Sequence, residues 1–565
     1  RSRIGTKRST TLPYPFFCHH AAPSLRVAKN QTRPRPCRYP RLWFWSRRKD
    51  KLEQLLPFYE TNDWARIWPE LSLALGAIMI LGLELFGMKD SSSGRTGVIA
   101  IFFQSVLFVG HLLDYLFWHH SAALNFFSDM ISQGLQAEVM RSFFLLSSLL
   151  VSIIGHRYLC RKGLKSGEFH HLTMLATAGL MLLCQSNHFL MLFVALETVA
   201  LCFYTLVAYN RDSAKSLEAG IKYLIFGALS SALLLFGIVL LYGVGANPEA
   251  WGASYPGHEF MDPLSFQYLG NLMSENPDNL MLRAGVVLIL AGIAFKVGAA
   301  PFQIWVPDVY HGSPLPITAF LGVSSKAAGF FVLLNLVNGP FEGMSEFLLP
   351  LLGFVATFTI FFGNLAACAQ RNVKRMLGLS GVAHAGYLLV AVMASMQFAG
   401  DDDRAIWVLF FYLFVYLLAS FCVFGVMGLA DLPDENEHEF SHYEDLAKKS
   451  PWAGFVLVSG IASLAGIPPF AGFIAKLLLI SVAYEAKLYL SLTAMVIGVV
   501  ISIYYYFGWM RAIALPRPAS FEDVEDAPDP WAGLSKTGFM KVVLVLLTVA
   551  SIVLGFWQGP FGDVF

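Results

Sequence analysis

Apolar segments long enough to cross a bilayer recur through most of this chain. Between Pro69 and Trp557 they alternate with short polar breaks, and each approaches the roughly 20 residues that span a ~30 Å hydrocarbon layer. The 565 residues are 56% hydrophobic and only 14% charged, so one soluble core cannot hide their apolar surface. Because backbone polar groups in lipid must be paired within their own segment, runs of this length favour helices over barrel strands. The sequence predicts an all-α polytopic membrane protein.

Fourteen such segments are expected to be transmembrane helices. Proline interrupts two of them, the seventh at Pro301 and Pro307 and the twelfth at Pro468 and Pro469. Since proline lacks the donor that a continuing helix needs, water, protein or ions must satisfy the freed carbonyls at each break. The predicted helices cover 69–87, 98–117, 143–158, 172–184, 189–209, 217–242, 282–305, 314–337, 347–369, 373–393, 405–430, 452–482, 488–510 and 540–557.

The two broken helices divide the chain into repeats. They lie in the middle of two successive blocks of five helices, which predicts two repeats of inverted topology. The expected parts are a basic N-terminal extension over 1–68, helices one to three over 69–160, the first repeat over 171–338, the second repeat over 347–510, and a loop with the last helix over 511–565.

The first fifty residues differ from the rest of the chain in charge. Lysine and arginine recur there, and Asp50 is the only acidic residue. This composition is typical of organelle-targeting segments, and the lack of an initial methionine favours processing or a partial sequence. Two interpretations remain open, a targeting segment that survives processing and a basic arm that is disordered or lies on a surface.

The cysteines give no sign of a redox centre. No CxxC pair and no spacing suited to zinc or an iron-sulfur cluster occurs among the seven, and no glycine-rich nucleotide-binding motif follows a plausible strand. We therefore expect no metal or organic cofactor within the bundle, and we expect redox chemistry to belong to a partner. The cysteines are Cys18, Cys37, Cys160, Cys184, Cys202, Cys368 and Cys422.

Ionisable residues inside the apolar segments are the main functional signal. A charge at the centre of a lone membrane helix costs at least ~2.5 to 3.5 kcal/mol on insertion scales, so such residues usually face a partner or water. An alternating row of them passes a proton by changing which neighbours are charged, and water bridges the longer gaps. Glu197 and a buried lysine would favour each other's charged forms. The candidates are Glu197, Lys222, Lys296, Lys326, His384 and Lys476.

Structural interpretations compete with this one at several positions. Lys222 lies near the start of its helix, where a lysine can reach the membrane interface, and Glu218 four residues earlier offers an ordinary helical ion pair. His384 is either a core histidine with satisfied hydrogen bonds or a relay group. Glu84 and Asp114 lie near helix ends and are expected to be structural.

The segments that carry these charges resemble one family of membrane proteins. Four stretches, LETVALCFYTLVAY, FKVGAAPFQIWVPDVYHGSPLPITAFL, NVKRMLGLSGVAHAGYLL and LAGIPPFAGFIAKLLLI, are similar to antiporter-like subunit 2 of mitochondrial complex I and to its bacterial counterpart, subunit N. The resemblance runs from about Pro69 to the last helix. It implies a proton-translocating subunit of NADH:ubiquinone oxidoreductase, with FMN, iron-sulfur clusters and ubiquinone in partner subunits. The implied partners are the other membrane and accessory subunits and membrane lipids, and not nucleic acid.

The resemblance also gives each candidate a place in the family pattern. Lys476 matches the helix-twelve lysine that is proposed in this family to exchange protons with the far side. The middle antiporter-like subunit is expected to carry glutamate at this position, so the lysine distinguishes the chain from it. The distal subunit is expected to carry a long lateral helix after the last span, and this sequence shows none. Glu197 matches the glutamate of helix five, and Lys222, Lys296, Lys326 and His384 match ionisable positions of helices six, seven, eight and ten.

Three other functions remain as alternatives. They are a subunit of a multisubunit cation/proton antiporter, a subunit of the plastid NDH complex, and an assembly spacer whose charges are relics. The expected location is the mitochondrial inner membrane, with the bacterial plasma membrane as the alternative. Basic residues gather in the odd-numbered loops, so the positive-inside rule places those loops in the matrix or cytoplasm and both termini on the opposite face.

Overall fold

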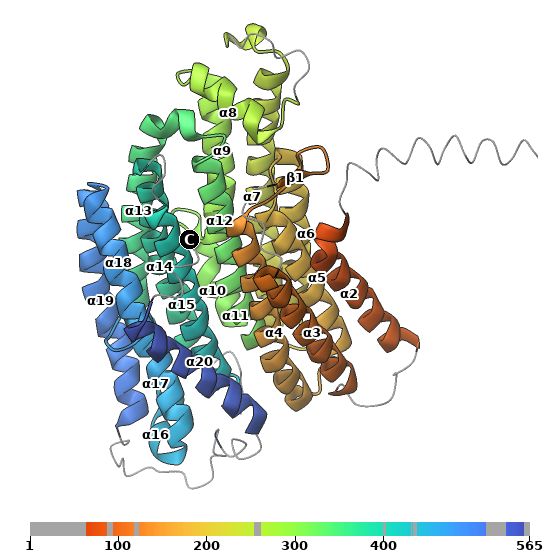
Figure 1. Ribbon diagram of the computed structural model, residues 1–565. Helices are drawn as coiled ribbons and strands as arrows, with labels where there is room; N and C mark the ends of the chain where they lie inside the picture. The colour runs from red at the N-terminus through yellow and green to blue at the C-terminus, as the bar shows by residue number, and fades with distance from the viewer. Residues whose placement is uncertain are drawn as a thin grey trace, which may run out of the picture. The chain divides into compact units, whose positions relative to one another are not determined.

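The computed structural model describes residues 64–86, 94–117, 124–253, 262–398, 403–430, 432, 438–515, 531 and 538–558. All of them belong to one compact unit that runs from Glu60 to Phe565, and Figure 1 shows their helices side by side. The basic extension predicted for 1–68 lies almost wholly outside the described residues. Neither of its two interpretations is therefore tested.

Each of the fourteen predicted spans has a counterpart in the described part of the chain. Twelve helices there are long and apolar enough to cross a membrane, and α5 together with the broken pair α17 and α18 supplies the other two. The bounds are α2 (Trp68–Phe86), α3 (Gly94–Phe117), α4 (Leu135–Lys162), α5 (Gly167–Cys184), α6 (Phe189–Val207), α7 (Ala214–Ala246), α9 (Leu280–Val297), α11 (Leu315–Phe320) with α12 (Lys326–Val337), α13 (Ser345–Cys368), α14 (Val373–Gln397), α15 (Arg404–Met427), α17 (Pro451–Ala465), α18 (Ala471–Glu485), α19 (Tyr489–Ala514) and α20 (Gly538–Phe556).

Shorter elements join these helices, and the sequence did not predict them. A two-stranded antiparallel hairpin, β1 (Leu124–Phe126) and β2 (Ile131–Gln133), pairs Leu124 with Gln133. The helices are α8 (Phe266–Glu275), α10 (Val306–Gly312) and α16 (Leu446–Lys449). Turns of 3-10 helix lie at Trp64–Ile67, Glu249–Trp251, Gln303–Trp305, Glu342–Met344 and Phe440–Tyr443, and a π-helical turn lies at Leu321–Ser325. Figure 1 shows the hairpin and α8 at one end of the bundle and α16 at the other.

The first broken helix ends where its backbone turns left-handed. Gly298 caps α9 with φ of 74°, a conformation that glycine adopts without a steric penalty. The Ala300–Pro301 peptide that follows is cis, and the N–H of Ala300 donates to Oγ1 of Thr359 on α13 at 3.0 Å. The predicted span 282–305 is therefore α-helical only as far as Val297, and α10 follows beyond its predicted end. A neighbouring helix satisfies part of the exposed backbone between α9 and α10.

The second broken helix repeats this construction. Gly466 caps α17 with φ of 81°, the Pro468–Pro469 peptide is cis, and α18 begins at Ala471. The helix before each break packs on the first half of the broken helix, α7 on α9 and α15 on α17. The matching breaks and helix contacts agree with two blocks of five spans in opposite orientation, and the bounds of these repeats stay a prediction.

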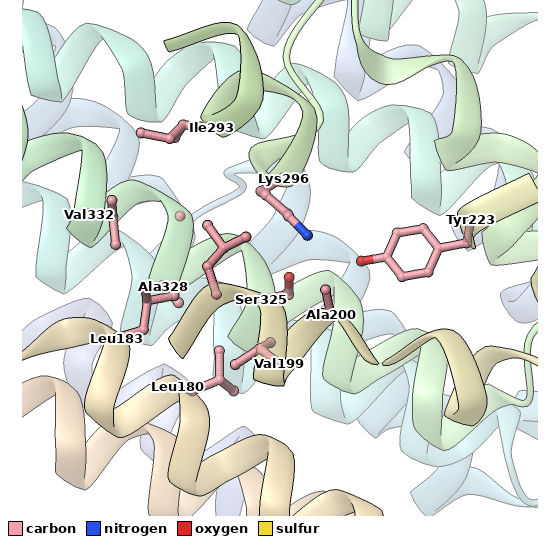
Figure 2. A pocket seen from close by; sticks show the side chains of 12 residues that line it. Leu180, Leu183, Val199, Ala200, Tyr223, Ile293, Lys296, Ser325, Ala328 and Val332 are labelled. Carbon is pink, nitrogen blue, oxygen red and sulfur yellow. The ribbon is translucent and has the colours of Figure 1, made fainter. Parts of the chain in front are cut away.

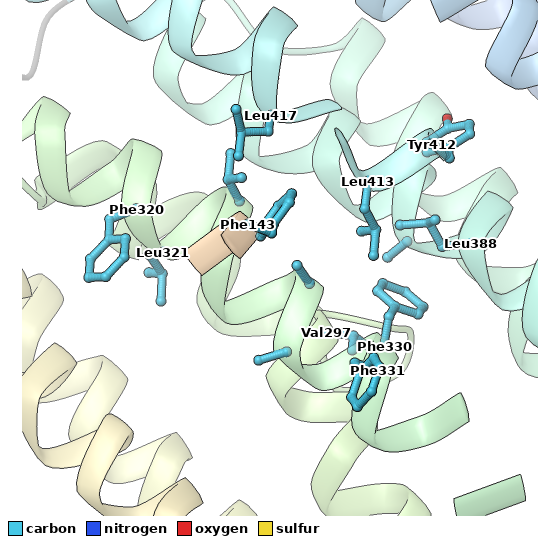
Figure 3. Packing of buried hydrophobic residues seen from close by; sticks show 14 of the residues in the cluster. Phe143, Val297, Phe320, Leu321, Phe330, Phe331, Leu388, Tyr412, Leu413 and Leu417 are labelled. Carbon is cyan, nitrogen blue, oxygen red and sulfur yellow. The ribbon is translucent and has the colours of Figure 1, made fainter. Parts of the chain in front are cut away.

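The helices in the middle of the bundle are apolar on every side. The span formed by α11 and α12 and the span α14 are buried through their apolar length, whereas only a third of the corresponding residues of α2, α3 and α20 are buried. Figure 3 shows this packing, with Phe330, Phe331 and Leu388 among the labelled side chains. Ionisable groups on α12 and α14 are thus enclosed by protein, while the outer helices present apolar side chains outward.

Helix α4 begins well before the predicted range 143–158 and takes two charged residues into the bundle. Arg141 and Glu138 lie in its first turns, and the Arg141 side chain is only 4% exposed because it pairs with Glu70 of α2. The predicted range 143–158 leaves Arg141 in the loop before the helix. That assignment is wrong, because the guanidinium has buried carboxylate partners within the chain.

Candidate functional site

Four of the six predicted site residues are enclosed in the bundle. Lys296 ends α9, Lys326 begins α12, His384 lies in the middle of α14, and Lys476 lies on α18 beside the second break. Their exposed fractions are 8%, 3%, 5% and 5%. Burial of this degree is rare for lysine unless the amine has a partner or water.

Lys296 faces a small apolar cavity. Figure 2 shows its Nζ pointing toward the hydroxyl of Tyr223, with Ser325 close by and apolar side chains around the rest. The cavity measures about 20 Å³, and about 10–15 Å³ is enough to hold one water. The helix break predicts that water, protein or ions satisfy the freed carbonyls, and the cavity beside Lys296 has room for one water.

Glu197 supplies a negative charge that acts on this lysine. It lies on α6, its carboxylate accepts a hydrogen bond from the hydroxyl of Ser231 on α7, and its charge acts on Lys296. No ion pair within 4.0 Å joins the two in the described part of the chain. The geometry supports a charge couple that acts across a gap.

Lys326 lies directly after the π-helical turn of the span formed by α11 and α12. Its Nζ is 5.8 Å from the centre of the Tyr310 ring. A Cβ on Gly381 of α14 would lie 2.6 Å from this Nζ and 3.2 Å from the Tyr416 hydroxyl, so the missing side chain leaves the space that the amine occupies. Nζ donates no hydrogen bond to the described residues, so packing and the Tyr310 ring hold the amine in place.

His384 and Lys476 form the far part of the row. Nδ1 of His384 shares a hydrogen bond of 2.7 Å with the Tyr412 hydroxyl, so both predicted roles for this histidine, core residue and relay group, agree with its position. A cavity of about 10 Å³ is lined by His384, Tyr412, Tyr416 and Lys476. It lies at the lower limit for one water.

Lys222 is more exposed than the four enclosed residues, with a side-chain exposure of 37%. Its Nζ is 2.7 Å from Glu218 on the same helix and 2.6 Å from Asp308 on α10, and Arg375 of α14 pairs with the same aspartate at 3.1 Å. The helical ion pair with Glu218 that the sequence predicted is confirmed. Sequence reasoning missed Asp308, although an acid directly after a helix break was a visible signal.

The arrangement is therefore a row with one outlier. Glu197 and Lys296 lie in the first repeat, and His384 and Lys476 in the second. Lys326 lies between them, since its Cε would be 4.0 Å from a Cβ on Gly298 at the end of α9 and its Nζ faces Gly381 of the His384 helix. Among the described residues, no group of three or more histidine, cysteine, aspartate or glutamate side chains is placed to hold a metal ion.

Comparison with known proteins identifies the family. The family described as NADH:quinone oxidoreductase/Mrp antiporter, TM, matches residues 186–502. NADH-quinone oxidoreductase subunit N 1 of Opitutus terrae is 46% identical over 508 residues, which cover 89% of this chain and 96% of that protein. The chain belongs to the subunit N family of NADH-quinone oxidoreductase. Subunit N of Desulforamulus reducens is 33% identical, with 86% of this chain and 95% of that one covered.

Solved structures agree with membership in the subunit N family. A chain of respiratory complex I from Thermus thermophilus aligns with a TM-score of 0.66 at 27% identity, over 87% of this chain and 97% of that chain. A chain of the Mrp complex from Dietzia aligns with a TM-score of 0.72 at 18% identity, over 89% and 96%, which shows a shared fold. The chain is thus an antiporter-like, multi-pass membrane subunit of complex I, and its structural neighbours come from multisubunit membrane complexes. The predicted family and fold are confirmed.

Proposed function

We propose that the protein moves protons along the row formed by Glu197, Lys296, Lys326, His384 and Lys476. The observation that carries the proposal is that these groups follow one another through the bundle, with water-sized cavities beside Lys296 and beside Lys476. When one amine takes up or loses a proton, the field on its neighbour changes, so the groups titrate as a coupled set. Water bridges gaps that are too long for direct transfer.

In this proposal, partner subunits supply the energy that drives the protons along the row. Quinone reduction elsewhere in the complex would bias the charge state at one end of the row, with FMN, iron-sulfur clusters and ubiquinone held by those partners. The other antiporter-like subunits and accessory subunits are the proposed neighbours. Purification of the native assembly tests this point, because flavin and iron-sulfur subunits should accompany the chain, whereas an antiporter complex would contain only other membrane subunits.

The location of the complex is part of the proposal. The mitochondrial inner membrane predicted from the sequence remains untested. The relatives compared above are bacterial, which favours the bacterial plasma membrane, the alternative of the sequence interpretation. Membrane fractionation of the source organism with an antibody against the chain distinguishes the two.

The direct experiment replaces the central amine. In the assembled complex reconstituted in sealed vesicles, Lys326→Met should abolish most proton pumping while the complex still assembles, because methionine keeps the apolar packing and removes the titrating group. Lys487→Gln, at a loop position, is the matched control. Wild-type pumping by Lys326→Met in a fully assembled complex would rule out the row as the route.

A further inference from the structure

A second group of buried charges lies in α2 to α5, away from the lysine row. Glu70 of α2, His111 of α3 and Arg141 of α4 are 3%, 1% and 3% exposed. All three precede residues 186–502, the region that matches the family described as NADH:quinone oxidoreductase/Mrp antiporter, TM. The proposed proton route does not use them.

Arg141 and Glu70 form a fixed clamp between α4 and α2. Nε and Nη2 of Arg141 donate to the two oxygens of Glu70, each at 2.8 Å, and Nε2 of Gln185 donates to Glu70 Oε1 at 2.6 Å. Both carboxylate oxygens of Glu70 are satisfied by this bidentate geometry. The positive charge of Arg141 is therefore matched by Glu70.

Glu138 adds a second carboxylate that faces a histidine. Its Oε1 accepts from Nη1 of Arg141 at 2.7 Å, while its Oε2 lies 3.7 Å from Nε2 of His111. No hydrogen bond from the described residues reaches either ring nitrogen of His111. A buried imidazole whose two nitrogens have no hydrogen-bond partner in the protein binds water or takes up a proton.

The charges in this cluster do not balance without a proton. The Arg141 guanidinium carries one positive charge, and the carboxylates of Glu70 and Glu138 carry two negative charges. The resulting net charge is unfavourable in a buried site. Among the described residues, the titratable groups that act on the cluster are Tyr115, Cys184 and Asp114, which is exposed and accepts from Nε1 of Trp68 at 3.2 Å. Arg66 contacts Arg141 through its backbone carbonyl, which accepts from Nη2 at 3.0 Å, while its guanidinium lies over the Phe126 ring. One proton shared by His111 and Glu138 makes the clamp and the pair neutral together.

A polar vestibule connects the cluster with one face of the bundle. A cavity of about 930 Å³ lies at the end that carries the hairpin and α8, and amide side chains such as Gln136, Asn187 and Asn335 line it. Gln185 lines it as well and donates to Glu70 on its other side. Glu138 is itself 25% exposed. The vestibule thus touches the cluster at Gln185, and its lining residue Ala137 directly precedes Glu138 in α4.

We propose that His111 and Glu138 share one exchangeable proton in a site that Glu70 and Arg141 hold in place, and that this site exchanges its proton with the vestibule face. The proton passes between water and the imidazole or carboxylate, so that no electron is transferred and no bond to carbon changes. The inference rests on the proposed function, because it adds a proton-exchange group on one side of the pump.

The test uses the assembled complex in sealed vesicles, with the pH varied on one side of the membrane at a time. The rate of quinone reduction by the wild-type complex should depend on the pH at the vestibule face. His111→Gln and Glu138→Gln should both lose or shift that dependence by a similar amount and leave the response to the opposite face unchanged. If His111→Gln does not assemble, the partly exposed Glu138 still gives the measurement.

A matched histidine serves as the control. His170 of α5 is fully buried, and its Nδ1 lies 3.3 Å from the Ser152 hydroxyl, so His170→Gln should keep the wild-type profile. The inference is overturned if both variants keep the wild-type profile, if only the response to the opposite face changes, or if the wild-type rate ignores the vestibule side. Lys326→Met in the same preparation distinguishes the two proposals. Normal pumping by this variant would rule out the lysine row, independently of how quinone reduction by the His111 and Glu138 variants depends on pH.

Discussion

The Nζ of Lys476 on α18 donates to the carbonyl oxygen of Leu464 at 2.9 Å, in the last turn of α17. A second hydrogen bond of 2.8 Å reaches the carbonyl of Ala465. These carbonyls have lost their helical partners at the break, and a lysine at a helix C-terminus satisfies them favourably. The same amine is therefore both a proposed proton carrier and the cap that joins two half-helices.

Loss of this cap should be visible in stability as well as in transport. We predict that Lys476→Met lowers proton pumping and also destabilises the protein by about 1.5 to 3 kcal/mol, the range for one hydrogen bond to a charged group. Thermal unfolding of the purified complex and pumping in vesicles measure the two effects. A variant that loses pumping with unchanged melting would mean that the cap contributes nothing.

Lys296 should affect transport without a comparable loss of stability. Its amine donates no hydrogen bond to the described residues and faces a small cavity. Lys296→Ala is therefore expected to assemble and to lower both pumping and the coupled quinone reductase activity. Lys222→Met is the comparison variant, because Lys222 is held by Glu218 and Asp308 outside the row. We expect the larger loss of pumping in Lys296→Ala, and the reverse order would count against the assignment.

Glu197 should matter through its charge. Glu197→Ala is predicted to lower pumping at least as much as Lys296→Ala, since a buried lysine without a counter-charge shifts toward its neutral form. Glu197→Gln keeps the hydrogen bond with Ser231 possible and removes only the charge, so it isolates the electrostatic effect. Full activity of the glutamine variant, measured as protons pumped per NADH oxidised, contradicts the charge couple.

Gly381 should be intolerant of a side chain for a specific reason. An added Cβ would lie 2.6 Å from the Lys326 amine, at the end of a flexible side chain that can move away. Gly381→Ala is therefore expected to assemble normally and to pump poorly, because the amine is displaced from its place beside α14. Gly508→Ala on α19, where a Cβ meets nothing within 4 Å, should behave as wild type in the same pumping assay.

The sequence predicted the spans and the buried charges well because both depend on local composition. Proline and glycine marked the breaks, and a lysine in an apolar run was visible without any structure. Pairing was harder to predict, because Asp308 meets Lys222 and Arg375 only after three helices pack together. Arg141 was misplaced for the same reason, since its partner Glu70 lies on a helix 71 residues away in the sequence.

The π-helical turn at Leu321–Ser325 gives the segment before Lys326 an unusual sensitivity to length. A π turn contains one residue more than the α-helix it interrupts, and each residue of an α-helix turns the chain by about 100°. If the same residues were wound as a regular α-helix, the extra residue would turn the chain after it by about 100° and direct the Lys326 side chain away from Gly381, although every charged group would still be present. The number of residues in this turn, more than their identity, therefore sets the direction in which the amine points.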